Sequence, residues 1–369
     1  MSEPVVITAA QARAWILTKQ GLAGPAVSRP NDVVGRVFAV QTQYASSLPV
    51  AVAARGATIR PNWDCRALAR GEIVKTWSVR STLHAHLPDD YALMLEALGA
   101  AKRENFLRWM HGQNGLGRAE VERLEGHMLD ALERGPLTRE ALHARVPEFR
   151  EFEMTGWGGD VMGLAYQGRL RLLTPVRGPT LFQRCEPPAQ TRDVFSARVE
   201  LLRRYLLAYG PATLADFLYW SGLKAGETTR VLATLAPELR EVQVEGLRGT
   251  RWVVASDEPP NDRARFSSRL LAKFDPLVMS YRDRRLFLSD SAAPKVFRKA
   301  GQVEATVLQR GRLVATWRLE KAGAKGATIR ISPLRAGGRL DIAALAPAAQ
   351  RLGKTLGLAS VTLNLARTG

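Results

Sequence analysis

The feature that most constrains the fold of this chain is a pattern of helix and turn signals that occurs twice. In the first copy, a helical run over residues 121–132 stops at Gly135-Pro136, and Thr138 caps a second helix. In the second copy the stop is Gly210-Pro211 and the cap is Thr213. Each copy continues with a third helical run and two strand-like runs that flank a basic turn. The other elements expected in the two copies are 139–145, 160–166, 170–175 and 180–184, and then 198–208, 214–220, 227–235, 241–245 and 250–254.

Three helices followed by a β-hairpin is the order of elements in a winged helix, a variant of the helix-turn-helix. A looser third copy opens the chain, with helices expected at 9–18, 31–40 and 47–55 and strands at 73–79 and 81–86. From about residue 263 the pattern changes to strands at 302–309, 312–319, 327–331 and 361–366, with a helix at 342–352. We therefore predict an α+β protein with winged helices at 1–118, 119–192 and 193–258 and a β-rich C-terminal domain at 259–369.

The charge of the chain indicates a polyanionic partner. Its 369 residues include 53 Lys and Arg against 35 Asp and Glu, a net charge of +18. Nucleic acid fits better than a membrane because no long apolar run occurs, although a solvated surface in an arginine-rich protein is the competing explanation. We find no signal-peptide pattern and expect a cytoplasmic, nucleoid-associated protein. The two cysteines, Cys65 and Cys185, lie far apart in sequence, which argues against a disulfide framework and a zinc ribbon.

Two glutamines, Gln41 and Gln43, follow the helical run at 31–40. Residues two apart face nearly opposite sides of a helix but the same side of an extended segment. Since Ser46 and Ser47 are good N-caps for the next helix, we place both glutamines on a short non-helical junction with their amides facing one space. Uncharged amides suit holding a water or reading a base edge. The alternative is that they cap carbonyl groups of the preceding helix.

Four short segments follow one another along the chain, namely Gln41-Thr42-Gln43, Thr76-Trp77 with Arg80-Ser81-Thr82-Leu83-His84, Phe274-Asp275-Pro276-Leu277 with Arg282-Asp283-Arg284, and Ala315-Thr316-Trp317-Arg318. Together they resemble the tandem winged-helix DNA glycosylases of the AlkZ and YcaQ type, and the resemblance covers nearly the whole chain. It implies a C-shaped arrangement of three winged helices and a β-rich part around a basic channel for duplex DNA.

The resemblance also implies that Gln41 and Gln43 are the catalytic pair and that the enzyme excises bulky or crosslinked N7-alkylated purines. Asp is typical of the second position in the YcaQ branch, so Gln43 favours the AlkZ branch. The residue between the two is usually apolar, and Thr42 departs from that pattern.

The chemistry can be argued from the residues alone. Alkylation at N7 gives the purine a positive charge, so the base leaves as a neutral group and needs no proton from the enzyme. Polar amides that orient water and stabilise an oxocarbenium-like sugar suffice for such a substrate. A neutral base would require more acid catalysis. Two glutamines therefore predict a narrow substrate class, cationic lesions. With the resemblance, we expect a monofunctional, metal-independent glycosylase that needs no cofactor.

Other residues are candidates for DNA contact. Arg80 and His84 would share one face of a strand, which His86 continues, and meet a phosphate or sugar. The pair His84 and His86 could also be a metal site. We see no third metal ligand and predict no metal. Asp275 is a candidate for stabilising positive charge on the sugar, and its alternative role is that of a turn residue. The remaining candidates for DNA binding are Arg282, Arg284, Arg310 and Arg312.

Two functions remain open at this point. The first is a monomeric glycosylase acting on double-stranded DNA that contains alkylated purines. The second is a non-catalytic winged-helix DNA-binding protein such as a transcriptional regulator. The expected recognition helices at 160–166 and 227–235 are poor in side chains that read bases, which weighs against a regulator.

Overall fold

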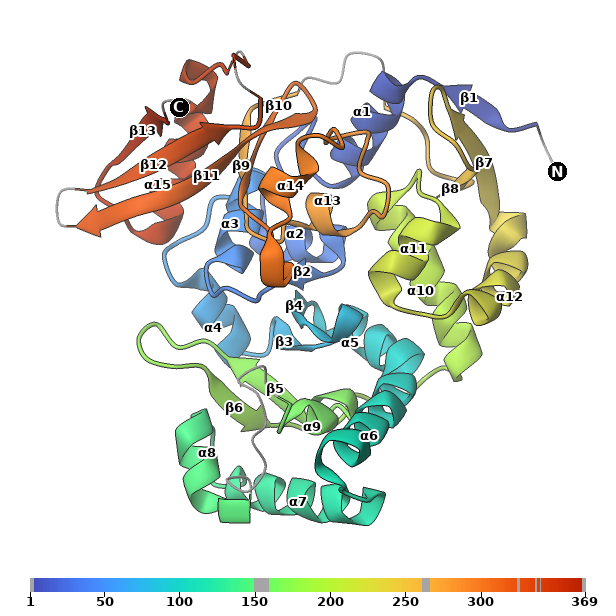
Figure 1. The fold of residues 1–369 in the computed structure, drawn as a ribbon, viewed down its shortest axis with the longest axis vertical. Helices are drawn as coiled ribbons and strands as arrows, with labels where there is room; N and C mark the ends of the chain where they lie inside the picture. Colours follow the sequence, from blue (N-terminus) through green and yellow to red (C-terminus); the bar gives the residue numbers. More distant parts are fainter. Residues whose placement is uncertain are drawn as a thin grey trace. The chain divides into compact units, whose positions relative to one another are not determined.

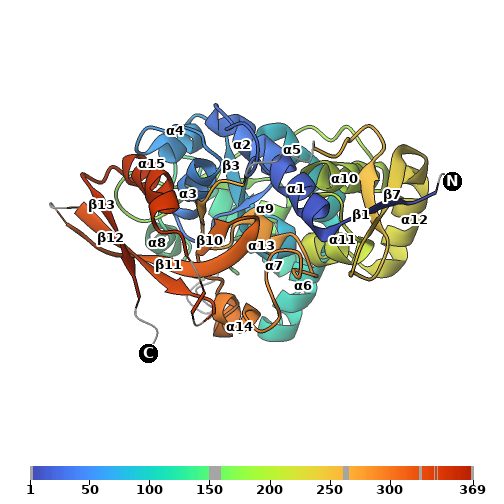
Figure 2. The same cartoon turned by 90° about the horizontal axis from the view of Figure 1, so that it is seen from above.

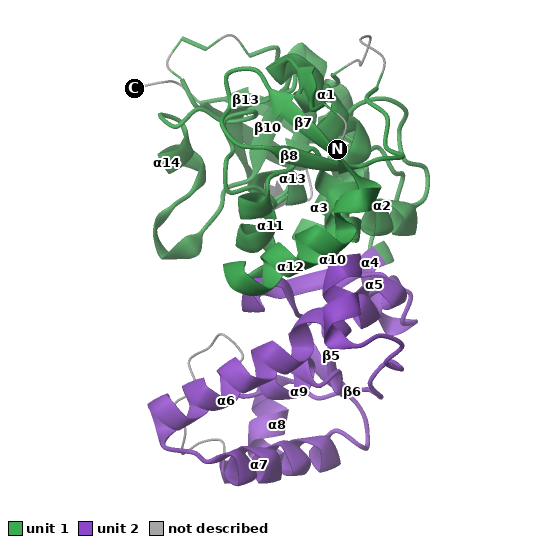
Figure 3. Ribbon diagram, turned by 90° about the vertical axis from the view of Figure 1, so that its right-hand side faces the viewer, with its two compact units in different colours: residues 1–63, 202–369 green, residues 64–201 purple. Residues whose placement is uncertain are grey.

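The computed structural model describes residues 3–148, 159–260, 266–323, 326–335, 337–338 and 340–366. It contains helices and small sheets in alternating stretches of the chain, which confirms the predicted α+β class (Figure 1). The chain divides into two compact units (Figure 3). Unit 1 comprises residues 1–63 and 202–369, and unit 2 comprises residues 64–201. Within the described ranges, no helix has the length and apolar character needed to cross a membrane.

The first copy of the repeat lies in unit 2. Thr138 caps the second helix of this copy as predicted, because its Oγ1 accepts a hydrogen bond from the backbone N–H of Ala141 at 3.2 Å. The core of this unit contains apolar side chains from all three helices and both strands. The elements are α7 (Arg118–Ala131), α8 (Arg139–Arg145), α9 (Met162–Tyr166), β5 (Leu170–Leu173) and β6 (Leu181–Arg184).

The second copy has the same order of elements, and most of it lies in unit 1. Thr213 and Asp216 form a capping box, in which each side chain accepts a hydrogen bond from the backbone of the other. An unpredicted strand, β1 (Val5–Ile7), adds in parallel to the first strand of the hairpin. The elements of this copy are α10 (Val194–Tyr209), α11 (Leu214–Ser221), α12 (Ala225–Leu235), β7 (Leu239–Val244) and β8 (Arg251–Val254).

Both copies are closed by the same backbone bridge. In unit 2, Leu137 exchanges two hydrogen bonds with Phe182 of β6, at 3.0 and 2.7 Å. In unit 1, Ala212 exchanges two with Trp252 of β8, at 3.2 and 2.8 Å. Each bridge joins the residue after the Gly-Pro stop to the second residue of the second strand, so the sequence repeat is also a structural repeat.

The N-terminal stretch of unit 1 contains the predicted helices with one shift. Helix α2 ends at Val37, three residues before the predicted end at residue 40, because Phe38 takes a left-handed conformation with φ of 62°. Phe38 then stacks on Trp220 with ring centroids 5.7 Å apart. The elements here are α1 (Ala9–Lys19), α2 (Pro30–Val37), β2 (Val40–Gln41) and α3 (Ser47–Ala54).

The N-terminal part of unit 2 holds the predicted hairpin and three helices that we did not predict. Helix α6 carries few apolar residues, and its Arg103 is buried in a two-point ion pair with Glu125 of α7 at 2.6 and 2.7 Å. A helix with so few apolar residues shows only weak hydrophobic periodicity in the sequence. The elements are α4 (Trp63–Ala69), β3 (Val74–Trp77), β4 (Leu83–His86), α5 (Pro88–Met94) and α6 (Ala100–Asn114).

The C-terminal part of unit 1 is a five-stranded sheet in the order β13-β12-β11-β10-β9. The predicted pairing across Arg310-Gly311 is confirmed, with Gln309 opposite Arg312. Helix α15 (Ala346–Leu356) contacts β13 and α3, and it lies over the outer strands in Figure 2. The strands are β9 (Arg269–Leu271), β10 (Thr306–Gln309), β11 (Arg312–Gly323), β12 (Gly326–Pro333) and β13 (Val361–Leu365).

Candidate active site

The two glutamines lie on the non-helical junction that the sequence predicts. Gln41 is the last residue of β2, and α3 begins at Ser47, so the residues from Thr42 to Ser46 form the connection. The backbone N–H of Ser47 donates to the carbonyl of Tyr44 at 3.0 Å, which turns the chain into α3. The glutamines are therefore not part of a helix.

The two amides differ in accessibility. Gln41 is 4% exposed and Thr42 is 2% exposed, whereas Gln43 is partly exposed. Among the residues that the structure describes, the Gln43 amide has no hydrogen-bond partner. An accessible amide with unused donors and acceptor is available to a water or a substrate. Of the pair that we expected to face one space together, Gln43 is the open member.

The residue after Gln43 is held in place by three contacts. The Tyr44 ring stacks on Phe274, with centroids 6.1 Å apart and planes 24° apart. The Lys273 ammonium lies 4.8 Å from the centroid of the same ring, within the range of a cation–π contact. The Tyr44 hydroxyl donates to Oε1 of Gln302 at 2.6 Å. Sequence reasoning did not find these partners because they lie more than 200 residues away along the chain.

Asp275 is buried and its carboxylate is fully engaged. Its Oδ1 accepts the backbone N–H of Leu277 at 3.0 Å and caps the short helix α13 (Pro276–Met279). Both carboxylate oxygens also accept from the Arg55 guanidinium at 3.0 Å, and both side chains of this ion pair are 0% exposed. These contacts are those of a turn residue, the alternative role that we considered for Asp275.

Arg80 and His84 do not share a strand, contrary to our expectation. Arg80 lies in the turn between β3 and β4 with φ of 51°, and β4 begins only at Leu83. His84 is 2% exposed, and its Nδ1 lies 2.9 Å from the carbonyl oxygen of Thr82. Burial, with the nearby charges of Arg80 and His86, holds the pKa of His84 well below its usual value, so the ring is neutral.

The two arginines that follow α13 have different surroundings. Arg282 is exposed, and its backbone N–H donates to Oδ1 of Asp216 at 2.8 Å. The Arg284 guanidinium instead lies 5.0 Å from the Tyr219 ring centroid and 4.2 Å from that of Phe297. Arg284 also donates to the Tyr219 hydroxyl at 2.7 Å. Arg282 is therefore the better placed of the two for a phosphate.

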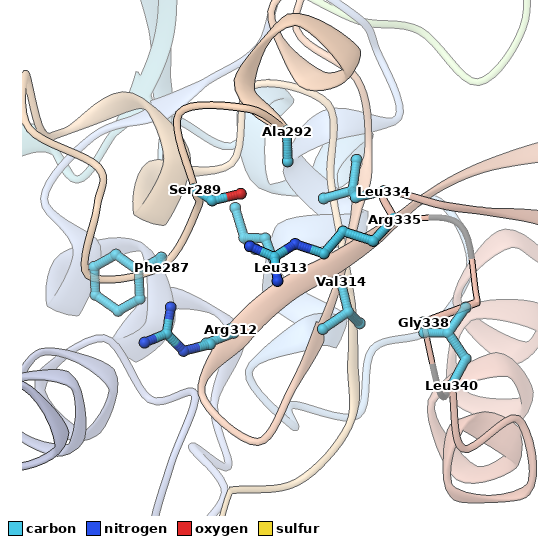
Figure 4. Close-up of a pocket in the computed structure, with 10 residues that line it drawn as sticks. All are labelled: Phe287, Ser289, Ala292, Arg312, Leu313, Val314, Leu334, Arg335, Gly338 and Leu340. Atoms are coloured by element: carbon cyan, nitrogen blue, oxygen red, sulfur yellow. The ribbon is translucent and has the colours of Figure 1, made fainter.

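The turn that carries Arg310 and Arg312 packs against unit 1 itself. Gly311 is buried, and a β-carbon at this position would lie 3.5 Å from side-chain atoms of both Leu17 and Phe266. Arg310 and Arg312 on either side are exposed. The side chain of Arg312 lines a pocket of about 420 Å³ together with Ser289 and Arg335, as Figure 4 shows. Two arginines and a hydroxyl favour an anion at this place.

A model of the AlkZ-like DNA glycosylases matches residues 34–355 of this chain. The chain belongs to the AlkZ-like DNA glycosylase family. A relative in Streptomyces sahachiroi, named interstrand DNA cross-link repair glycosylase, is 27% identical over 329 residues, which cover 84% of this chain and 87% of the relative. The solved structure of the Streptomyces sahachiroi DNA glycosylase AlkZ is similar in fold, with a TM-score of 0.81. That match, at 24% identity, covers 98% of this chain and 100% of the other.

In this AlkZ-like glycosylase, the described residues include no group of three or more His, Cys, Asp or Glu side chains that could hold a metal ion. The hydrogen bond between Nε2 of His86 and the Ser78 hydroxyl, at 2.8 Å, uses one member of the histidine pair. Family membership makes DNA the substrate class and the N-glycosidic bond the bond that is broken.

Proposed function

We propose that this AlkZ-like glycosylase hydrolyses the N-glycosidic bond of cationic N7-alkylated purines in double-stranded DNA, with Gln41 and Gln43 positioning the attacking water. The observation that carries the proposal is the accessible Gln43 amide, which has no partner within the described residues. A monofunctional, metal-independent reaction follows from this chemistry, since the damaged base leaves without being protonated.

The roles of the two glutamines follow from their burial. Gln43 offers an acceptor for a water proton and two donors, so it can orient the water toward the anomeric carbon. Gln41 is almost fully buried in β2, and its dipole is therefore fixed when the substrate arrives. Fixed dipoles lower the barrier because they need no reorganisation as positive charge develops on the sugar.

The name of the Streptomyces relative extends the proposal to bulky adducts and interstrand crosslinks. Support for the AlkZ branch comes from Gln at position 43. We further propose that the two closed repeats and the N-terminal elements act as tandem winged helices around a basic channel, with the protein working as a monomer. The paired bridges that end each repeat support this reading.

We propose that the DNA backbone is bound by exposed arginines. The net charge of +18 provides long-range attraction to phosphates. Arg282, Arg310 and Arg312 are exposed, and Arg80 is partly exposed. Arg284 and His84 are already engaged within the protein, so we assign them supporting positions beside these contacts.

The proposal is tested by single-turnover excision from duplexes that carry N7-methylguanine, N3-methyladenine, a neutral lesion, or a crosslink between two guanine N7 atoms. We expect release of the cationic bases and no release of the neutral one. Gln43→Ala should abolish excision and leave DNA affinity unchanged. Retained excision with lost affinity would overturn the assignment. Binding to one defined sequence without excision of any lesion would instead favour a transcriptional regulator.

A further inference from the structure

The turn between β9 and α13 packs against the segment that follows the two glutamines. We call the residues Lys273, Phe274 and Asp275 the brace turn. The Ser47 hydroxyl donates to the backbone carbonyl of Lys273 at 3.2 Å, and the Tyr44 ring stacks on that of Phe274. The brace turn thus contacts the chain directly after Gln43 and again where α3 begins.

The brace turn is itself fixed to α3. Arg55 is the residue that closes α3, and its guanidinium holds the buried carboxylate of Asp275 through two hydrogen bonds of 3.0 Å. The brace turn therefore meets α3 at its first residue, Ser47, and at its C-cap, Arg55. These two attachments fix the brace turn beside Tyr44.

The backbone of Phe274 is in an unfavourable conformation that the surroundings impose. Its φ of 57° lies in the left-handed region, which a bulky side chain rarely adopts. Asp275, the next residue, is locked by Arg55 and by its cap on α13, so the ring of Phe274 is aimed at Tyr44. Strained residues of this kind persist where the structure needs a side chain in one particular place.

Tyr44 is exposed, so its contacts are not part of the hydrophobic core. It is 38% exposed, yet its ring and its hydroxyl both have partners, namely Phe274, Lys273 and Gln302. An exposed tyrosine without such partners samples several rotamers. Here three contacts act on the one residue that follows Gln43, and Thr42 on the other side is buried.

We propose that Tyr44 and Phe274 are positioning residues that hold the Gln43 amide in its reactive orientation. This inference rests on the proposed role of Gln43. Because the Gln43 side chain has no partner of its own within the described residues, its orientation depends on its backbone. Neither ring needs to touch the substrate. Loss of either ring should slow the chemical step while binding of DNA stays intact.

The test compares Tyr44→Ala, Phe274→Ala and the double variant by single-turnover excision of N7-methylguanine and by DNA affinity. We expect each single change to lower the rate constant by about 100-fold, the cost of a small misplacement of a catalytic group, with an unchanged Kd. The double variant should be no slower than either single one, since the two rings act as a pair. Tyr44→Phe keeps the stacked ring and should restore most of the rate.

Controls separate this inference from protein damage. Phe195→Ala removes a ring of equal exposure, 38%, from α10 and should retain the wild-type rate. Phe274→Leu keeps most of the buried volume without the stacked ring, and it should be as slow as Phe274→Ala even if the alanine variant folds poorly. Three results would overturn the inference. They are rate losses that multiply in the double variant, a loss of DNA affinity with no change in rate, and a wild-type rate for Tyr44→Ala.

Gln43→Ala, measured in parallel, shows which idea fails. If Gln43→Ala retains excision, the proposed function is wrong. If Gln43→Ala abolishes excision but Tyr44→Ala does not slow it, the proposed function stands and the positioning role is wrong.

Discussion

Arg55 and Asp275 form a two-point ion pair in which neither side chain is exposed. Both hydrogen bonds are 3.0 Å long, and they join the end of α3 to the start of α13. A buried pair of this kind adds little net stability compared with well-packed apolar side chains, but removal of one member leaves an uncompensated charge. The pair therefore fixes the relative position of two segments next to Gln43.

Asp275→Asn should lower the free energy of unfolding by about 3–5 kcal/mol, because the Arg55 charge stays buried without its partner. Urea denaturation measures this loss. The matched control is Glu72→Gln, which breaks the exposed pair with Arg70 and should change stability by less than about 1 kcal/mol. Wild-type stability in Asp275→Asn, combined with lost excision, would show instead that the carboxylate acts on the substrate.

Thr42→Val should raise the free energy of unfolding by about 1 kcal/mol. The Thr42 side chain is buried, and its hydroxyl oxygen has no hydrogen-bond partner among the described residues. Valine has nearly the same shape without the hydroxyl. Thr76→Val is the matched control, because the Thr76 hydroxyl donates to the carbonyl of Leu170 at 3.1 Å, and its loss should destabilise the protein. Thermal denaturation of both variants gives the comparison.

Stability should fall as the pH is lowered below 6.5, in part because of His84. Its folded pKa is held well below the ordinary value of 6.5 by burial and by neighbouring positive charge. As the pH is lowered, the unfolded chain therefore binds the proton before the folded chain does. The contribution of His84 to the free energy of unfolding is complete above pH 6.5 and is lost as the pH falls toward the folded pKa. The slope is at most about 1.4 kcal/mol per pH unit. Melting temperatures of the wild type and of His84→Gln over this range should converge at low pH.

Lys102 should titrate below the ordinary range of a lysine ammonium group. Burial, helped by the nearby Arg80 charge, lowers the pKa of its ammonium group to about 8. The same group lies 3.4 Å from the Ser81 hydroxyl in unit 2. After reductive ¹³C-methylation, one lysine resonance should move with a midpoint near pH 8 and should be missing from Lys102→Met. If every lysine resonance titrates near the ordinary value, this prediction is wrong.

Arg312→Ala should weaken DNA binding uniformly across sequences. A phosphate contact contributes about 0.9 to the slope of log K against log salt concentration, so the variant should lose about that much. Arg118→Ala is the control, because Arg118 is exposed but paired with Glu104 and Glu122. Fluorescence anisotropy over a range of salt concentrations measures both slopes, and equal slopes for wild type and Arg312→Ala would exclude the contact.

The elements predicted correctly are those whose signals are local. The Gly-Pro stops and the caps at Thr138 and Thr213 act within a few residues, and both repeats follow from them. Strands β1 and β9 were not predicted because each is three residues long and is stabilised by partners far away in sequence. Short strands carry too few residues for a periodic pattern to be visible.

The same contrast between local signals and distant partners applies to the candidate site. The non-helical junction at Gln41 and Gln43 could be predicted from the spacing of the two amides and from the serine caps that follow. The support of that junction could not, since Tyr44 meets Phe274 and Gln302 only after the chain has folded. The burial of Asp275 depends likewise on Arg55, 220 residues away.

The bridges from Leu137 to Phe182 and from Ala212 to Trp252 tie the second strand of each hairpin, next to its loop end, to the residue that follows the Gly-Pro stop. The loops at residues 177–179 and 247–249 therefore lead into a second strand that is already tied to its own repeat. We expect a substitution in either loop to leave the strand register unchanged, because the register is set by backbone hydrogen bonds within the hairpin and at the bridge.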